Sequence, residues 1–175
     1  MTRLIEPHIP ALRRYARALL RDVTAADDLV QDALERAVAR WHSRRGEGDV
    51  RNWLFAILHN RFIDQGRKHR RHMTVPLDEA TLPKIAPPQL HELEHAQLLA
   101  SVHQLPEGLR TVLLLIALEG LSYRECADVL RIPTGTVMSR LSRAREGLAT
   151  MIKATGDGVI PFGLRQKLDN RRQET

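Results

Sequence analysis

The chain has 175 residues, 43% of them hydrophobic and 27% charged, which is typical of a soluble protein that buries a core. Its single cysteine, Cys126, excludes a disulfide framework and a thiolate metal cluster. No long apolar stretch follows a charged N-terminus, and the longest apolar run, residues 112–118, is far shorter than the roughly 20 residues that a membrane span needs. These features predict a cytoplasmic protein without a membrane-inserted segment.

The positive charge of the chain is concentrated in residues 40–72. This segment holds nine basic and three acidic residues, so its excess equals the net charge of +6 of the whole chain. A concentrated basic stretch is typical of a surface that contacts nucleic-acid phosphates. The alternative is a solvated basic helix that binds nothing.

Helical periodicity runs through the N-terminal part of the chain. It predicts a first helix over about residues 7–21 and a second that opens at Thr24, where Asp27 follows three residues later as in a capping box. The second helix has an apolar stripe that ends at Trp41, and its outward side is acidic. A loop over residues 42–49 precedes a third helix, from about residue 50 to residue 71, whose second half is basic.

Residues 73–89 contain four prolines and no sustained period, which predicts a linker. Further on, residues 121–148 predict a helix, a tight turn and a second helix. Ser122 is expected to cap the first of these helices, Pro133 to break it, and Thr134 to cap the second. The second helix has a buried apolar stripe formed by Val137, Leu141, Ala144 and Leu148.

The opposite face of that last helix is polar and basic, with Thr136, Ser139, Arg140 and Arg143. A helix with an apolar back and such a front, preceded by a short helix and a turn, is typical of a helix-turn-helix that reads the major groove of DNA. An ordinary helical hairpin with a solvated face is the alternative.

The residues HELEH, 91–95, have the H-E-x-x-H spacing of zinc proteases, in which two histidines bind zinc and Glu92 would be the general base. A catalytic zinc needs a third protein ligand and a sheltered cavity. His103 lies three turns from His91, roughly 18 Å along a helix, and no metzincin-type G-x-x-H follows. We therefore expect no catalytic residue, no resident metal and no cofactor. Adventitious metal binding by His91 and His95 stays open.

Four stretches, in this order and spacing, resemble bacterial sigma factors of the extracytoplasmic-function (ECF) group within the sigma-70 family. They are TAADDLVQDALERAVARW, RNWLFAILHNRFIDQGRKHRR, LPEGLRTVLLLIALEGLSYRECADVL and IPTGTVMSRLSRARE. The resemblance covers about residues 5–152. It implies a dissociable subunit that binds core RNA polymerase and directs it to promoters with particular −10 and −35 elements. The implied partners are the clamp helices of the largest (beta-prime) subunit, promoter DNA and, as for many members, an anti-sigma factor.

The resemblance also assigns roles to three groups of residues. The acidic side of the second helix would dock the clamp helices, through Asp27, Asp28, Gln31, Asp32 and Glu35. The third helix would melt and read the −10 element, with Asn60 bonding an extruded base and the phosphates held by Arg61, Arg67, Lys68, Arg70 and Arg71. The last helix would read the −35 element, through Thr136, Met138, Ser139, Arg140, Ser142 and Arg143. Met138 departs from the family, which often has Lys or Arg there.

The same resemblance gives roles to a loop and to two aromatic residues of the N-terminal part. The loop over residues 43–49 aligns with the family's specificity loop. Trp53 and Phe55 are candidates for stacking on DNA, and of the two Trp53 is the one expected to pack in the domain core.

The predicted fold is all-α, with two small helical domains joined by a flexible Pro-containing linker, and the C-terminal domain is a helix-turn-helix. The expected division is a sigma region 2 domain over residues 1–72, a linker over 73–89, a sigma region 4 domain over 90–155 and a tail over 156–175. Two rival interpretations are a stand-alone helix-turn-helix regulator and a metal-dependent enzyme. The first has no use for an acidic second helix beside a basic third one.

Overall fold

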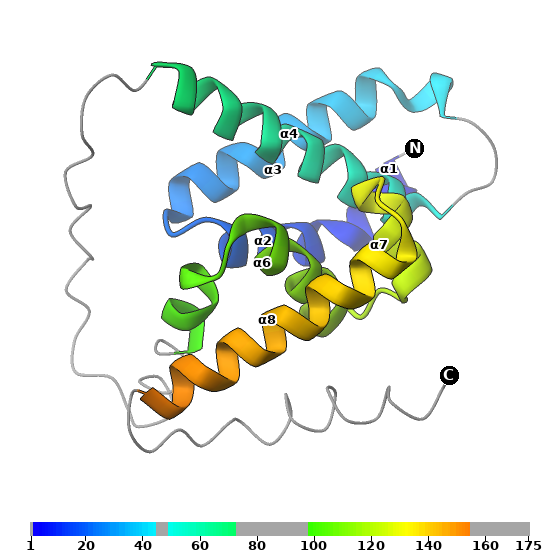
Figure 1. The fold of residues 1–175 in the computed structure, drawn as a ribbon. Coiled ribbons are helices and arrows are strands. Elements are labelled where there is room, and N and C mark those ends of the chain that lie inside the picture. The colour runs from blue at the N-terminus through cyan, green and yellow to red at the C-terminus, as the bar shows by residue number, and fades with distance from the viewer. Residues whose placement is uncertain (1, 45–48, 73–97, 155–175) are drawn as a thin grey trace.

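The structure, a computed structural model, describes residues 2–44, 49–72 and 98–154. These residues form helices and connecting turns, without a strand, which confirms the predicted all-α class (Figure 1). The first part of the chain contains α1 (Thr2–Ile5), the 3-10 helix η1 (Glu6–His8), α2 (Ile9–Leu19), α3 (Val23–Ala39), η2 (Trp41–Ser43) and α4 (Val50–His72). After a helical segment at 98–104, the second part contains α6 (Glu107–Leu113), the π-helix η3 (Leu114–Leu118), α7 (Tyr123–Leu130) and α8 (Thr134–Ala154).

The N-cap of α3 lies two residues before the predicted position at Thr24. The N-cap is Asp22, whose extended backbone places a carboxylate oxygen 2.9 Å from the amide nitrogen of Ala25. Thr24 already lies inside the helix. An Asp side chain satisfies one of the free N–H groups of the first turn, and its negative charge also suits the positive end of the helix dipole. The capping signal was therefore present in the sequence, two residues before the predicted position.

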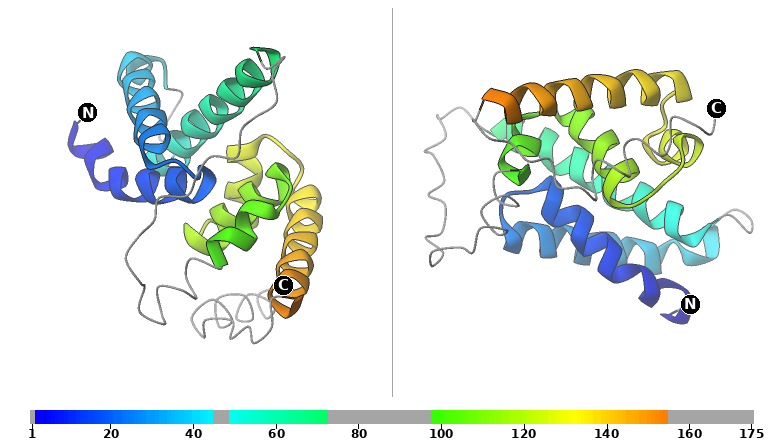
Figure 2. Two further views of the ribbon diagram at one scale, coloured as in Figure 1. Left: turned by 90° about the vertical axis from the view of Figure 1, so that its left-hand side faces the viewer. Right: turned by 90° about the horizontal axis from the view of Figure 1, so that it is seen from below.

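Helices α2, α3 and α4 pack around the first part of the core. α3 and α4 diverge from α2 in the left view of Figure 2, and each contacts it. Tyr15 of α2 and Phe55 of α4 are fully buried and meet edge to face, with ring centroids 5.5 Å apart. An aromatic pair of this geometry contributes about 0.5–1.5 kcal/mol beyond the area that it buries. Phe55 is thus a core residue, which corrects its candidacy for stacking on DNA. Trp53 is half-buried and packs against the core, as expected.

The Tyr15 hydroxyl is buried without a hydrogen-bond partner among the described residues. Burial raises the pKa of this phenol well above its usual value, so the group stays neutral. Tyr15→Phe should raise the free energy of unfolding by about 1 kcal/mol, because it removes an unsatisfied buried polar group and leaves the ring in place. Urea denaturation measures this, with Tyr123→Phe as the control, since the Tyr123 side chain is only partly buried. A loss of stability for Tyr15→Phe alone would show that the hydroxyl is satisfied.

The second part of the chain is built around a buried run of residues that passes from α6 into the π-helix η3. Residues 111–116 are all buried, and the last of them belong to the π-helix η3. Gly120 follows with φ of +72°, a conformation that a side chain would strain. α7 begins with a complete capping box, in which Ser122 and Glu125 bond each other's backbone N–H groups. The prediction that Ser122 caps this helix is confirmed, and Glu125 is its partner.

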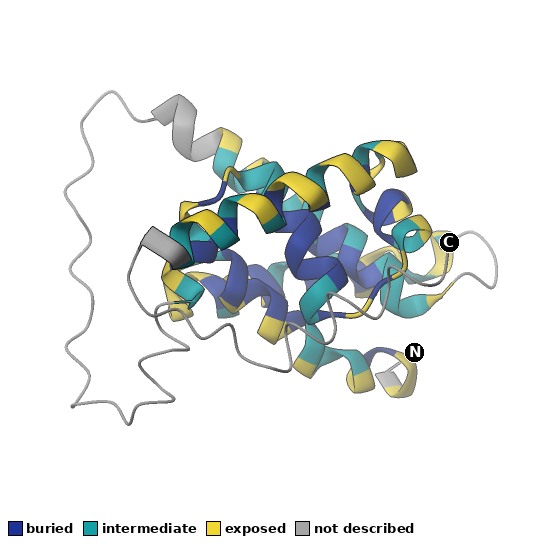
Figure 3. Cartoon of the chain, turned by 60° about the horizontal axis from the view of Figure 1, so that its bottom comes forward, coloured by how far each residue is buried: buried dark blue, intermediate teal, exposed yellow. Residues whose placement is uncertain are grey.

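The two parts share one hydrophobic core. α4 contacts α7, and α2 contacts η3, so the buried side chains of both parts form one continuous cluster. Figure 3 shows the buried positions in the centre of the molecule and a row of exposed positions along the outer face of α8. The linker predicted over residues 73–89 and the tail over 156–175 lie outside the described residues, and the predicted domain limits stay a prediction.

Candidate functional site

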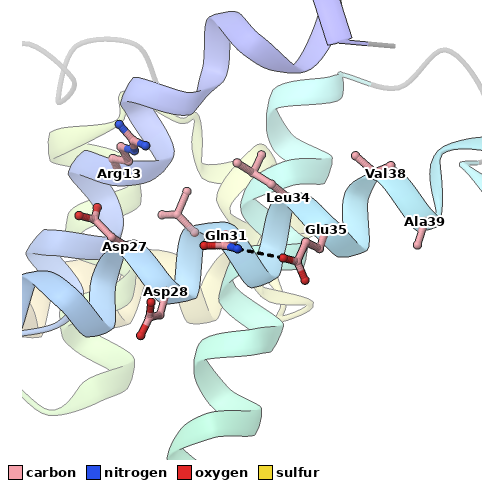
Figure 4. Close-up of a pocket in the computed structure, with 9 residues that line it drawn as sticks. Arg13, Asp27, Asp28, Gln31, Leu34, Glu35, Val38 and Ala39 are labelled. Carbon is pink, nitrogen blue, oxygen red and sulfur yellow. Dashed lines mark hydrogen bonds between the residues drawn. The ribbon is translucent and has the colours of Figure 1, made fainter.

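The outward side of α3 forms a groove of about 630 Å³ together with Arg13 of α2. Its polar wall contains Asp27, Asp28, Gln31 and Glu35, and its apolar wall contains Val30, Leu34 and Val38 (Figure 4). The Gln31 amide donates to a Glu35 carboxylate oxygen at 3.1 Å. Val38, 49% exposed, is one of the few exposed large hydrophobic side chains among the described residues. We call this surface the acidic groove.

Asp27 and Asp32 of the acidic side of α3 have partners on neighbouring helices. Asp27 accepts from Arg17 of α2 at 3.2 Å in an exposed ion pair. Asp28 and Glu35 are exposed, and Glu35 bonds Gln31 of the same helix. The acidic groove therefore keeps at least two carboxylates for a basic partner.

Asp32 lies at the side of α3 that faces α4. It bonds Arg61, and the Gln65 amide donates to the same oxygen at 3.3 Å. The hydrogen bond from Arg61 lowers the pKa of Asp32, so the carboxylate stays charged. Arg61 is only 13% exposed. The structure thus joins two residues that the sequence assigned to different interfaces, and the pair fixes α3 against α4.

Two of the predicted −10 residues, Asn60 and Arg67, lie on the exposed side of α4, whereas Arg61 faces Asp32. Asn60 and Arg67 are exposed, and the Asn60 amide makes no hydrogen bond to another described residue. Its neighbour His59 is largely buried, and burial lowers the pKa of His59 to about 4. His59 is therefore neutral near pH 7 and adds no charge to this surface. Lys68, Arg70 and Arg71 belong to α4, but their side chains lie outside the described ones.

A small pocket lies at the start of α4, where the predicted specificity loop ends. Its volume is about 380 Å³, and its lining comes from both parts of the chain: Arg44, Asp49, Asn52, Trp53, Ala56, Asp128 and Val129. Trp53 and Trp41 meet edge to face at 6.0 Å, and the Arg44 guanidinium lies 5.3 Å from the Trp41 ring. Residues 45–48 of the loop lie outside the described residues.

α7, a turn and α8 form the predicted helix-turn-helix. Arg131 ends α7 in the left-handed conformation with φ of 54°, and Pro133 follows. Val137, Leu141, Ala144 and Leu148 are all buried, which confirms the predicted stripe. Thr134 is the first residue of α8 rather than its cap, and the carbonyl of Pro133 accepts from the N–H groups of Thr136 and Val137.

The outer face of α8 presents the predicted −35 residues to different degrees. Met138, Ser139, Ser142 and Arg143 are exposed, whereas Thr136 and Arg140 are half-buried. The Arg140 guanidinium packs on Gly108 of α6, 3.3 Å from where a Cβ would stand. Ser139 donates to the Thr136 carbonyl at 3.1 Å, and Ser142 donates to Glu146 at 3.0 Å. Among the arginines in the described part of α8, Arg143 is therefore the most exposed.

Sequence reasoning missed a charged cluster between the two parts of the chain. Glu119, at the end of η3, has a completely buried side chain, and Arg14 and Arg51 bond it from α2 and α4. The partners lie 105 and 68 positions away, so no local pattern signals them. The only local hint is a carboxylate placed directly after an apolar run.

The HELEH stretch, with His91 and His95, lies outside the described residues. Within the described ranges, no group of three or more His, Cys, Asp or Glu side chains is arranged to hold a metal ion. Helices long and apolar enough to cross a membrane are also absent from those ranges.

Comparisons with known proteins match both parts. The family "Sigma2 domain of PhyR" matches residues 5–59, and "Sigma-70, region 4" matches residues 95–148. The chain is 35% identical over 156 residues to the ECF RNA polymerase sigma factor EcfG of Rhodopseudomonas palustris, covering 89% of this chain and 85% of that protein. It is 31% identical over 156 residues to the ECF sigma factor SigM of Mycobacterium tuberculosis H37Rv, covering 89% and 79%.

A solved structure supports the same relation. The sigma factor RpoE of Bartonella quintana, solved with the anti-sigma factor NepR, matches with a TM-score of 0.73 and 32% identity, covering 85% of this chain and 94% of that chain. The matches span both parts of the chain in one order, and the helix-turn-helix with its exposed basic face lies where region 4 is matched. The chain belongs to the ECF sigma factors of the sigma-70 family.

Proposed function

We propose that three surfaces divide the work of promoter-specific initiation. The acidic groove binds the basic clamp helices of core RNA polymerase, the outer side of α4 melts and reads the −10 element, and the outer face of α8 reads the −35 element. The observation that carries this assignment is the separation of free charges: exposed carboxylates on α3, and an exposed amide and arginines on α4 and α8. A stand-alone regulator needs the last of these surfaces alone.

Within this proposal, Asp32 and Arg61 have mainly a structural role as an ion pair between α3 and α4. Their bond fixes the angle between the helix that meets polymerase and the helix that meets DNA. Asn60, with an amide that can donate and accept, suits the Watson–Crick edge of an extruded base. Arg67 and the basic residues after it, Lys68, Arg70 and Arg71, suit phosphates and carry no sequence information.

We further propose the setting and partners of this activity. Because the relative from Bartonella quintana is solved with an anti-sigma factor, we infer that a protein of that class holds this chain inactive. RNA synthesis belongs to the polymerase, so this chain acts as a regulator rather than an enzyme, in the cytoplasm with the polymerase and DNA.

Run-off transcription tests the proposed function directly. Core polymerase with the purified chain should start transcripts on a library of promoters with varied −10 and −35 elements, and core polymerase alone should not. Sequence-specific DNA binding by the free chain, together with an absence of transcripts from the mixture, would instead favour the stand-alone regulator.

Asn60→Ala should impair promoter melting more than initial promoter capture. The substitution removes an exposed amide with no bond to the described residues, so the fold should be unaffected. If the amide pairs with an extruded base, its loss should lower open-complex formation about tenfold, the value of one hydrogen bond of about 1.4 kcal/mol. Permanganate footprinting reports the melted strand and gel shift reports capture. Asp64→Ala, also exposed on α4, is the control, and equal footprints for Asn60→Ala and the wild type would reject the role.

A further inference from the structure

One buried carboxylate bonds residues of the other part of the chain. The Glu119 side chain is 0% exposed. Arg14 of α2 bonds both of its oxygens, with Nε donating at 2.9 Å and Nη2 at 2.7 Å. Arg51 of α4 places its Nη2 3.6 Å from the same carboxylate and also donates to the Glu119 backbone carbonyl. Both cations come from the part matched to sigma region 2, and the carboxylate comes from the part matched to region 4.

A second polar contact lies near it, at the start of α4. The Asn52 amide nitrogen donates to Glu125 of α7 at 3.0 Å. The Asn52 amide oxygen is buried without a partner among the described residues. Asn52, Ala56 and Asn60 follow one another at four-residue intervals, so they lie along one side of α4. Asn60 is exposed, whereas α7 covers the Asn52 end of the same stripe, where Asp128 and Val129 help to line the small pocket.

This packing is incompatible with reading both promoter elements at once. By their names, the −10 and −35 elements lie about 25 base pairs apart, roughly 85 Å of duplex at 3.4 Å per base pair. A compact chain of this length has a radius of gyration of only about 16 Å. α8 packs on α6 and α7, and α7 in turn packs on α4 of the first part (Figure 1). The two parts therefore have to separate before one chain can reach both elements.

We propose that Glu119, with Arg14 and Arg51, is a latch that keeps the free chain closed, covers one end of the −10-reading stripe and restrains holoenzyme formation until it opens. The occlusion part of this inference rests on the proposed function of α4. A buried carboxylate paired with two arginines suits a latch, because all three charges regain water when the two parts separate. If a substitution removes one partner instead, the closed form keeps a buried and unpaired charge and is destabilised. Glu119→Gln keeps the shape of the side chain and removes its charge.

Distances between spin labels test the latch without polymerase. Labels at Ala25→Cys on α3 and Thr150→Cys on α8, both exposed positions, in a Cys126→Ala background, report the separation of the two parts. The wild type should give mainly one short distance, and Glu119→Gln should raise the long-distance population about tenfold or more, as expected for loss of a hydrogen-bonded charge. Glu6→Gln, the same chemical change at an exposed site, should leave the distribution unchanged. Equal distributions for the wild type and Glu119→Gln, or a mainly long wild-type distance, would overturn the proposal.

A second variant guards against a folding defect in the C-terminal part. Arg14→Gln with Arg51→Gln removes the cations from the other side of the contact and should lengthen the distances as Glu119→Gln does. Circular dichroism should show unchanged helix content for both variants. Distances that lengthen for Glu119→Gln alone, with lost helix content, would assign the effect to unfolding and reject the latch.

Binding to core polymerase tests the consequence of opening. If only the open form binds, the apparent affinity is reduced by the open fraction, so an about tenfold larger open fraction should tighten apparent binding by up to about tenfold. Lengthened distances with unchanged affinity would refute control of binding by the latch. Absence of core binding by the wild type would reject the proposed function instead, and the spin-label result would still decide whether the latch exists.

Discussion

Replacing Asp28 and Glu35 by lysine is expected to weaken binding of core polymerase by about a hundredfold or more. Truncating one partner of a charge pair buried in an interface costs about 2–5 kcal/mol, and charge reversal adds repulsion from the basic clamp helices. Both side chains are exposed on α3, and within the described residues the partner of Glu35 is Gln31 of its own helix. The loss should therefore come from the interface and not from the fold.

The choice of positions makes this experiment decisive. Asp32→Lys would break the bond to Arg61 and leave a nearly buried cation facing a lysine, so it would weaken the packing of α3 on α4 as well. Glu6→Lys with Glu146→Lys makes the same change in net charge at exposed positions outside the acidic groove. Fluorescence titration of labelled chain with core polymerase measures the dissociation constants. Equal losses for both double variants would show a general charge effect and remove the acidic groove from the interface.

Arg143→Ala is expected to relax the base preference within the −35 element and to leave the −10 preference unchanged. Arg143 is exposed on α8, on the side opposite the buried Val137, Leu141 and Ala144. A bidentate bond from arginine to guanine discriminates by about 1–3 kcal/mol, which is roughly 5- to 150-fold between bases. Transcription from a library saturated at the −35 element measures this preference. A profile identical to that of the wild type would show that α8 reads through other residues.

Arg140→Ala is the matched control on the same helix. The Arg140 guanidinium packs against Gly108 and is half-buried, which suits a fixed phosphate contact better than a base contact. Its loss should weaken transcription about equally across the library and make the salt dependence shallower, because one phosphate contact fewer releases fewer counterions. Measurement at two salt concentrations therefore separates the two arginines.

Single helices and their buried sides followed from the sequence. The period of 3.6 residues predicted the stripe of Val137, Leu141, Ala144 and Leu148, all of which are buried. Ser122 signalled the start of α7, because a cap acts on backbone groups within its own turn. The outward face of α8 followed from the same period, and so did the family to which the chain belongs, since its motifs are local and ordered. These features depend on residues within a few positions of one another.

The tertiary structure decided which side chains are buried and which charges pair wherever the partners are far apart in the sequence. Periodicity places Trp53 and Phe55 on the same helix, but only the position of Tyr15 makes Phe55 the buried ring of the two. Asp32 belongs to the acidic pattern of α3, yet its orientation toward α4 gives it Arg61 as a partner. Glu119 meets Arg14 across 105 positions, because the apolar faces of both parts pack into one core and bring their charged edges together. Local sequence gives each helix a buried face, and the packing of those faces determines which charges meet.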